Sequence, residues 1–367
     1  KRLRKYIIMQ SLNNIKIEDI GYLSDLSKNE IIFRKKNLSE FQAQGFPSKT
    51  NEEWKFIDLG SLLSKNSSNL EIISANTVNN KTIDNILKTF PIDLADKNYI
   101  LSIDGFIKKV EIKHEDKKSI KIDKSIDTSK LTSNDPLECL NNALNTDYIK
   151  LIVQKDYSFN KPLVILNYSD QSIDTVSLNQ KFDIHINKNS NLTLMNFFNY
   201  KSKKSFYNFH QHYYLEEGSI LKNYSVDLSD NSNLNYIKTN IDLFKNSISE
   251  NFIISQGSEY SKNEISCNLI DQHSSAFVNG IIKLDNQKKH EIRSKINHIA
   301  PNTKSYQLIK CILSDSSKAV YQGKIFVNKE AQKTDGYQLS KAILLDQNTE
   351  FNAKPELEIY ADDVKCS

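Results

Sequence analysis

The second half of the chain carries a long series of short apolar runs, and this series restricts the fold more than any other feature. Many of the short runs lie ten to fifteen residues apart, with Asn, Ser, Asp and Gly between them. Short apolar runs bounded by turn-forming residues are typical of β-strands. The runs are Tyr148–Val153, Pro162–Leu166, Phe182–Ile186, Leu192–Leu194, Ser219–Leu221, Phe252–Ile254, Ile281–Leu284 and Ala319–Val327.

No helical period of useful length interrupts these strands, so the second half is predicted to be all-β. Such a pattern fits a sandwich, a barrel or a solenoid. More than 200 residues of it favour a solenoid, because sandwiches are usually shorter. No clear repeat is visible in the residues, and the pattern alone therefore leaves the three architectures open.

The composition excludes several functions. Lys and Arg number 49 and Asp and Glu 45, so the net charge of +4 is too balanced to favour a nucleic-acid partner. No apolar run approaches the ~20 residues of a membrane helix. The four cysteines, at 139, 267, 311 and 366, lie far apart and form no CxxC pair, which leaves no local zinc or cluster motif. We expect reduced thiols in a cytosolic protein.

The start of the chain is basic and then briefly apolar, from Lys1 to Met9. The apolar part is shorter than the ~7–15 residues of a signal-peptide core, and no small-residue cleavage site follows. We therefore predict no export signal and expect Met9 to be the natural start.

The first part of the chain is predicted to contain helices. Asn29–Gln44 has helical spacing of its apolar residues, with Asn29 as the expected N-cap, and Ile83–Phe90 is a shorter candidate. Asp104-Gly105 predicts a hairpin within 98–112, because glycine tolerates the positive φ of a type I′ turn. Pro136–Leu144 is again helical in pattern, and Trp54 is expected to anchor a small core without touching a ligand.

The last stretch, Ala331–Ser367, is predicted to form strand, turn and strand. Leu357 and Ile359 alternate with polar residues, which gives the strand one apolar face. Pro355 lacks an N–H and belongs at a strand start or at an edge. Asp362-Asp363 suits a turn, because short acidic side chains hydrogen-bond their own backbone.

Two short sequence motifs in the chain resemble the SufB/SufD family, the scaffold subunits of iron–sulfur cluster assembly. The first, 354–367, reads KPELEIYADDVKCS, and the second places Glu52, Trp54, Lys55 and Phe56 after a proline-marked turn. Within that family the chain is most similar to the SufD branch. The resemblance implies a right-handed parallel β-helix over 97–367 after a helical region over 1–96, with the family's C-terminal helical segment absent.

The same resemblance implies a scaffold without catalytic turnover, which pairs with a SufB-like subunit and a SufC-like ABC ATPase. The chain itself contains no P-loop, so ATP hydrolysis is expected of that partner. A second copy of the chain is the expected partner when SufB is absent, and neither nucleic acid nor membrane is expected. The expected interface residues are Thr334, Asp335, Gln338, Ile343, Leu345, Glu356, Glu358 and Tyr360.

The resemblance also bears on cluster ligands. It implies a transient iron–sulfur cluster or iron shared with SufB, and nothing held stably by this chain alone. Cys366 is the candidate ligand, because a thiol is a soft ligand suited to iron. Ser340 stands near the place of a functional SufB cysteine, which favours the SufD branch. The family's proposed ligand histidine would follow Ser367, so the chain resembles a truncated member.

Other residues invite chemical interpretations. His210 and His212 point to one face of a strand and could share a metal, although structural roles are expected for them and for His298. Cys267 and Cys311 have apolar neighbours and are predicted to be buried and inert.

Two alternatives to the scaffold stay open. A β-helical carbohydrate lyase or hydrolase would use paired carboxylates, from Asp362-Asp363 or from Glu356 and Glu358. A purely structural surface solenoid is the other. The missing export signal counts against both, and the single tryptophan counts against the enzyme.

Overall fold

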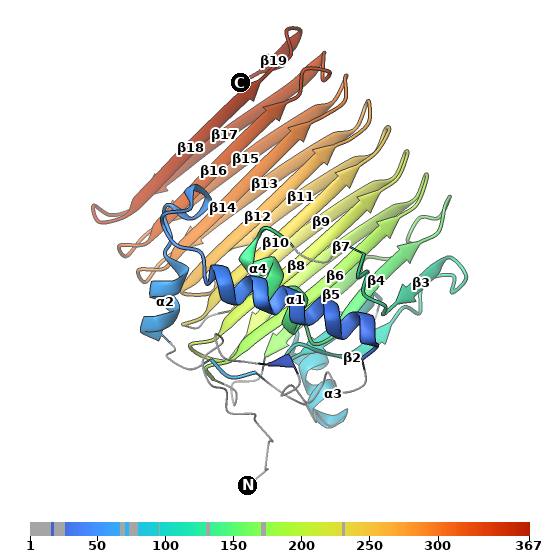
Figure 1. Ribbon diagram of the computed structural model, residues 1–367, viewed down its shortest axis with the longest axis vertical. Helices are drawn as coiled ribbons and strands as arrows, with labels where there is room; N and C mark the ends of the chain where they lie inside the picture. Colours follow the sequence, from blue (N-terminus) through green and yellow to red (C-terminus); the bar gives the residue numbers. More distant parts are fainter. Residues whose placement is uncertain are drawn as a thin grey trace.

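The computed structural model describes residues 16–17, 26–66, 70–72, 80–94, 96–129, 133–169, 174–229 and 232–367. The expected start at Met9 lies outside the described residues. Two long sheets stand face to face, and helices lie against their outer sides (Figure 1). No helix in the described ranges is long and apolar enough to cross a membrane.

The architecture is a parallel β-solenoid, as predicted. One sheet has ten strands in the order β19-β17-β15-β13-β11-β9-β7-β5-β1-β2, and the other has nine in the order β18-β16-β14-β12-β10-β8-β6-β4-β3. From β4 onward, odd-numbered strands belong to the first sheet and even-numbered strands to the second. The pairs β1–β2 and β3–β4 are antiparallel, and the other neighbours are parallel. The chain thus alternates between the sheets, with two strands in each turn.

The strand bounds of the ten-stranded sheet are β1 Asn98–Ile103, β2 Phe106–Glu111, β5 Leu163–Ser169, β7 Asn191–Tyr200, β9 Ile220–Asp227, β11 Ile248–Ser255, β13 Ser275–Leu284, β15 Lys304–Leu313, β17 Thr334–Leu344 and β19 Val364–Cys366. Those of the nine-stranded sheet are β3 Ile120–Asp123, β4 Tyr148–Val153, β6 Ser177–Ile186, β8 Phe206–Leu215, β10 Leu234–Leu243, β12 Tyr260–Leu269, β14 Lys289–His298, β16 Lys318–Val327 and β18 Glu350–Ile359.

A serine or threonine repeats at the corners that lead from the nine-stranded to the ten-stranded sheet, and a repeat of one residue is not visible in the sequence. Its hydroxyl donates to the carbonyl three residues earlier, at 2.6–3.1 Å. The residues before it often adopt positive φ, as Asn246 and Asn302 do. Short polar side chains tolerate that conformation, so the Asn- and Ser-rich intervals are the corners. The corner residues are Ser219, Ser247, Ser274, Thr303 and Thr334.

The interior between the sheets is mostly apolar but contains a buried polar ladder. Asn196 donates to Gln211 at 3.0 Å and to Asn223 at 3.2 Å, and Asn223 donates to Asn251 at 3.2 Å. Each amide therefore finds its partner on a neighbouring strand, as a buried polar group requires. These inward amides break the apolar alternation, which is why the sequence predicted shorter strands than the structure contains.

The helices precede and flank the first turns. They are α1 (Lys28–Gln44), the 3₁₀ turn η4 (Glu52–Trp54), α2 (Leu59–Asn66), α3 (Asn80–Thr89) and α4 (Pro136–Leu144). The α1 helix begins one residue earlier than predicted, because Ser27 and not Asn29 is its N-cap and accepts from the Glu30 N–H. The predicted α4 helix is confirmed.

The hairpin predicted at Asp104-Gly105 is also confirmed. It joins β1 and β2, and both turn residues have positive φ.

Helices α1 and α4 lie over the outer face of the nine-stranded sheet (Figure 1). An apolar cluster lies between these helices and the sheet. Trp54 is 5% exposed in this cluster, which also contains Phe206 and Tyr236 of the sheet. The expectation that Trp54 anchors a core is therefore confirmed. Helix α3 instead packs on the ten-stranded sheet, where it covers residues of β1, β5 and β7.

Candidate functional site

The last turn of the solenoid leaves both sheets with an open edge. In the described chain β18 pairs only with β16. β19 pairs with β17 only over Thr334 to Gly336, and the Ser367 carbonyl accepts from Gln338 N–H at 2.8 Å. Among the described residues, the rest of β17 has no neighbour on that side. An unpaired strand edge is a template for another strand.

Alternation along β17 shows which backbone groups point to this edge. Asp335 and Leu345 donate their N–H groups to Thr303 and Leu313, at 3.0 and 2.9 Å. In a parallel sheet successive residues hydrogen-bond to opposite sides. The odd-numbered residues of β17 therefore bond to β15. The N–H and carbonyl groups of Ser340, Ala342 and Leu344 point to the open edge.

On β18 the arrangement is reversed. Glu350 and Tyr360 donate to Ser317 and Val327 at 3.2 and 3.0 Å, so the odd-numbered residues point to the open edge. Pro355 is one of them, and no ladder hydrogen bond is lost there. The prediction that Pro355 lies at an edge is confirmed.

The open turn also exposes large apolar side chains. Ile343 is 59% exposed, Leu345 63% and Tyr360 60%. In the described residues no further strand lies against this turn, and inward residues of β18 are also exposed. The complete set of exposed large apolar residues at this end is Ile343, Leu344, Leu345, Leu357, Ile359 and Tyr360.

The remaining residues expected at the interface all lie in this turn, in different settings. Asp335 is exposed, and Gln338 is partly buried. Thr334 is buried, because its hydroxyl donates to Ala331 in a corner. Glu356 and Glu358 form ion pairs with lysines of the same sheet, at 2.6 Å.

Cys366 lies at the end of β19, partly buried. It packs on a small cluster with Ile325, Val327 and Ala331. Burial raises the pKa of the Cys366 thiol, which favours the protonated form at neutral pH. Metals bind the thiolate, so ligation here requires loss of that proton. Among the described residues no three His, Cys, Asp or Glu side chains are grouped to hold a metal ion.

The histidines have hydrogen-bonding roles. His210 is buried, and its Nε2 lies 2.9 Å from Asn208 Oδ1, whereas His212 Nε2 hydrogen-bonds to Asp242 Oδ2 at 2.9 Å. His298 hydrogen-bonds to Thr303 and Ser305 through its two ring nitrogens.

The internal cysteines are buried as predicted. Burial raises the pKa of both Cys267 and Cys311 to about 12. Such thiols are inert at neutral pH.

The paired carboxylates do not have the properties of glycosidase acids. Hydrogen bonding to Lys324 lowers the pKa of Glu358, whereas a general acid needs a raised pKa. Asp362 and Asp363 are exposed in a turn, where Asp363 N–H donates to Gln332 at 2.9 Å. They are turn residues, as predicted.

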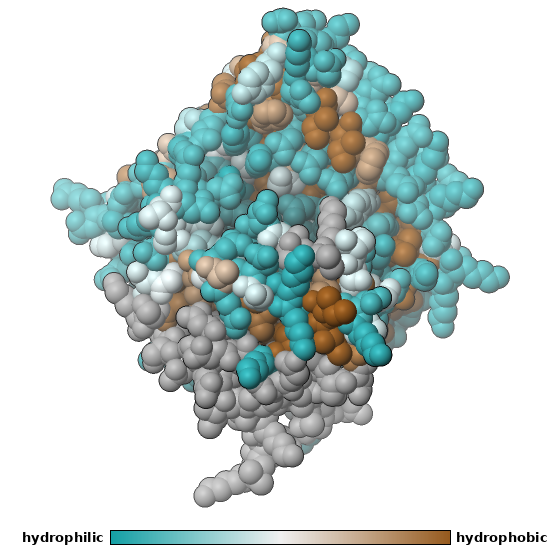
Figure 2. Space-filling view, viewed as in Figure 1, coloured by the Kyte–Doolittle hydropathy of each residue, from teal (hydrophilic) through white to brown (hydrophobic). Residues whose placement is uncertain are grey.

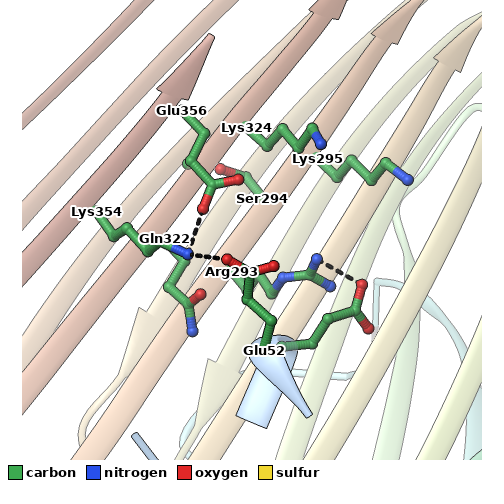
Figure 3. A pocket seen from close by; sticks show the side chains of 10 residues that line it. Glu52, Arg293, Ser294, Lys295, Gln322, Lys324, Lys354 and Glu356 are labelled. Atoms are coloured by element: carbon green, nitrogen blue, oxygen red, sulfur yellow. Dashed lines mark hydrogen bonds and ion pairs between the residues drawn. The ribbon is translucent and has the colours of Figure 1, made fainter. Parts of the chain in front are cut away.

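A charged groove of about 120 Å³ lies beside the last turn, on the outer face of the nine-stranded sheet (Figure 3). This face of the molecule is largely hydrophilic (Figure 2). Glu52 and Glu53 of η4 form one wall, and strands β14, β16 and β18 form the other. The strand residues are Arg293, Ser294, Lys295, Gln322, Gly323, Lys324, Lys354 and Glu356.

The groove brings together the two sequence motifs that resemble the family, the one around Glu52 and the one at 354–367. Lys354 Nζ lies 2.9 Å from Glu52 Oε1 and 2.6 Å from Glu356 Oε1, although Glu52 and Lys354 are 302 residues apart. Two turns earlier, Arg293 of β14 pairs with Glu53 at 2.7 Å. The N-terminal region is thus linked directly to the last turns of the solenoid.

The sequence analysis did not identify the buried charges beneath the contact between η4 and the last strands. Lys262 is 1% exposed and Glu291 is fully buried, and their side chains pair at 2.6 Å. Lys262 Nζ also donates to the Glu53 carbonyl at 2.7 Å and lies 4.5 Å from the Trp54 ring centre. Charges at every second residue of 262–264 and 291–295 were the available signal, since such spacing marks one strand face.

The similarity to known proteins covers the solenoid. A family described as "SUF system FeS cluster assembly, SufBD core domain" matches residues 168–367, more than half of the chain. The iron–sulfur cluster assembly protein SufD of Escherichia coli (strain K12) is 26% identical over 160 residues, which are 39% of this chain and 37% of that protein.

Two further relatives match shorter parts. An iron–sulfur cluster assembly SufBD family protein of Synechocystis sp. is 36% identical over 72 residues, 20% of this chain and 16% of its own length. The chloroplastic protein ABCI7 of Arabidopsis thaliana is 37% identical over 83 residues, 22% and 18%. The matched region spans well under two thirds of each of these relatives.

Proposed function

The chain belongs to the SufBD family of the SUF system for iron–sulfur cluster assembly, and we propose that it is the SufD-type scaffold subunit of an assembly complex. In this role it pairs with a SufB-like subunit and with a SufC-like ABC ATPase in the cytoplasm. It contributes structure and ligands and has no turnover of its own. When SufB is absent, a second copy takes its place.

The open edges of the last turn support this proposal most strongly. Ser340, Ala342 and Leu344 present backbone hydrogen-bonding groups, and Ile343, Leu345 and Tyr360 present apolar side chains beside them. Strand addition at an edge gains hydrogen bonds along the backbone, and the side chains supply specificity. The SufB-like subunit adds its own last strand to β17.

The groove explains how the N-terminal region serves the scaffold. The ion pairs of Glu52 and Glu53 connect that region to β18 and β14. The buried Lys262–Glu291 pair fixes the strands between them. A partner bound at the last turn is therefore held in a defined position relative to the rest of the chain.

The cluster site belongs to the interface in this proposal. Cys366 supplies one thiolate ligand from the end of β19, and the SufB-like subunit supplies others. The raised pKa of Cys366 predicts that binding of iron releases a proton.

The test replaces Ala342 with proline. The Ala342 N–H points to the open edge, so proline there removes a donor from the edge and none from the ladder within the chain. The variant is co-expressed with the SufB-like and SufC-like proteins of the same organism. We expect the wild-type chain to form the complex in size-exclusion chromatography with light scattering, and Ala342→Pro to weaken SufB binding at least ten-fold.

Ala342→Ser keeps the N–H and is the matched control, with binding expected at the wild-type level. Ile343→Pro is a second control, because the Ile343 N–H bonds to β15 and its loss lowers stability instead. If Ala342→Pro melts like the wild type and binds SufB equally well, β17 is not the interface. If no wild-type complex forms at all, the proposed scaffold role is wrong.

A further inference from the structure

Helix α3 shows how the outer face of the ten-stranded sheet binds a helix. Ile83 and Ile86 of α3 lie in one apolar cluster with Leu166 of β5 and Phe197 of β7. The Phe90 ring, just after the helix, meets Phe197 edge to face at 5.3 Å between centroids. The α3 helix thus covers the outward apolar residues of the first strands in this sheet.

The same rows of outward residues continue beyond α3. Phe197 is followed in register by Val226, Ile254 and Ile281, on β9, β11 and β13. The neighbouring row leads from Met195 through Tyr224 to Phe252. Tyr224 is already 38% exposed. The sheet therefore keeps the apolar surface that α3 covers, without the helix.

We call this surface the aromatic stripe and define it by Tyr224, Val226, Phe252, Ile254, Phe277, Ile281, Tyr306 and Leu308. Every one of these side chains is partly or largely exposed. Phe277 and Tyr306 are neighbours in register, and Tyr306 stacks on Tyr337 with centroids 5.0 Å apart. Asn279 lies between Phe252 and Leu308 in register, and Glu250, which pairs with Lys222, precedes Phe277. Exposed apolar side chains gathered on one sheet face still mark an interaction site.

Lysines border the stripe where its rows end. Lys310 follows Ile281 in register, Lys341 follows Lys310, and Lys283 lies two residues beyond Ile281. In the described part of the chain none of the three forms an ion pair. Like charges directly opposite each other on neighbouring strands are destabilising, so Lys310 and Lys341 gain most from a negatively charged partner.

We propose that the aromatic stripe binds an acidic amphipathic helix of a partner protein. Strands lie about 4.8 Å apart, so β9 to β15 span roughly 14 Å. The ten residues of α3 measure about 15 Å at 1.5 Å per residue. A helix of about three turns therefore fits, with apolar residues on the stripe and carboxylates near Lys283, Lys310 and Lys341. This surface is a sheet face, and it meets the open edge of the last turn only at β17, through Lys341.

The probe is a fluorescent 14-residue peptide with leucine at positions i, i+3, i+4 and i+7 of a helix and glutamate elsewhere. Its partner peptide has lysine in place of glutamate. Fluorescence anisotropy with the full chain is expected to show at least ten-fold tighter binding of the acidic peptide. Ile254→Glu and Tyr306→Glu are expected to weaken it at least ten-fold.

Thr193→Glu is the matched control, because Thr193 faces outward on the same sheet but outside the stripe. It leaves binding unchanged. Lys310→Glu combined with Lys341→Glu reverses the preference toward the basic peptide. Circular dichroism checks that each variant is folded.

Equal affinity for both peptides overturns the proposal. An unchanged affinity of Ile254→Glu and Tyr306→Glu for the acidic peptide overturns it too. Light scattering adds a further outcome. If the chain alone forms a dimer that Tyr306→Glu dissociates, a second copy occupies the stripe and the partner helix is excluded.

Discussion

Tyr224 and Tyr236 lie on successive strands, β9 and β10, and both point away from the interior of the solenoid. Tyr224 is 38% exposed on the ten-stranded sheet, whereas Tyr236 is 2% exposed on the nine-stranded sheet. Tyr224 has the apolar neighbours Met195 and Phe252 in register, whereas Tyr236 has Asn208 and Lys262. The covering residues differ as well, because the Trp54 ring centre lies 5.4 Å from that of Tyr236 and nothing comparable lies over Tyr224 in the described chain.

The residues packed over the outer face of each sheet determine which side chains that face can contain. Under the N-terminal region, Lys262 and Glu291 are buried and paired, and Tyr236 donates its hydroxyl to Glu264 at 2.9 Å. On the part of the ten-stranded sheet beyond α3, apolar rings and the lysines Lys283, Lys310 and Lys341 are exposed, and no ion pair of these lysines occurs in the described chain. Buried charges are tolerated only with partners, so they occur beneath the N-terminal region, whereas exposed lysines do not need one.

The largest expected effect comes from breaking the buried pair. Lys262→Met leaves the Glu291 carboxylate buried without its cation, and we expect a loss of about 3–5 kcal/mol in the free energy of unfolding. Burial already raises the pKa of Glu291, so the variant adapts by binding a proton there. Urea denaturation at pH 7 measures the loss.

The double variant Lys262→Met/Glu291→Leu is the control for this pair. It removes both charges, and we expect it to recover most of the stability, because apolar replacements of a whole buried pair are often neutral. A Lys262→Met variant as stable as the wild type would show that the N-terminal region does not bury this pair in solution.

The two tyrosines give the next largest effect and the most direct comparison of the faces. Tyr236→Ala removes a buried ring beneath Trp54, and we expect a loss of about 3–4 kcal/mol. Tyr224→Ala removes a ring that is already partly in water, and we expect about 1 kcal/mol or less. Equal losses in urea denaturation would mean that the stripe is covered within the chain itself.

Much of the fold could be predicted from local patterns. The hairpin followed from Asp104-Gly105, and the strand β4 and the helix α4 lie where their residues predicted them. The strand lengths were underestimated because inward amides such as Asn196 and Asn223 interrupt the apolar alternation. The repeat is not visible in the sequence because only one Ser or Thr recurs in each turn.

Less of the candidate site could be predicted. The place of the last turn was predicted from the motif at 354–367, and the place of Pro355 at an edge was predicted from its missing N–H. The pairing of Lys262 with Glu291 depends on the register between β12 and β14, and the residues alone do not give that register. The contact of Glu52 with Lys354 depends on how the N-terminal region folds back, which local pattern does not encode either.

The smallest expected effect concerns protonation beneath the cover. Burial, with a contribution from Lys238, lowers the pKa of His210 to about 3 from its usual 6.5. The folded protein thus keeps this imidazole neutral, while the unfolded chain binds a proton near pH 6.5. Stability from His210 is therefore fully present above pH 6.5 and is lost as the pH falls toward 3.

The measurement is urea denaturation at several pH values. Between pH 6.5 and 5 we expect His210 to account for about 1–2 kcal/mol of the fall in the unfolding free energy. His210→Gln keeps a donor for Asn208 and removes this titration, so its stability should fall less over the same range. The buried His290 and His298, whose pKa values burial lowers to about 4, still contribute in the variant. An unchanged slope would show that water reaches His210 and that the nine-stranded sheet is less covered at β8 than at β10.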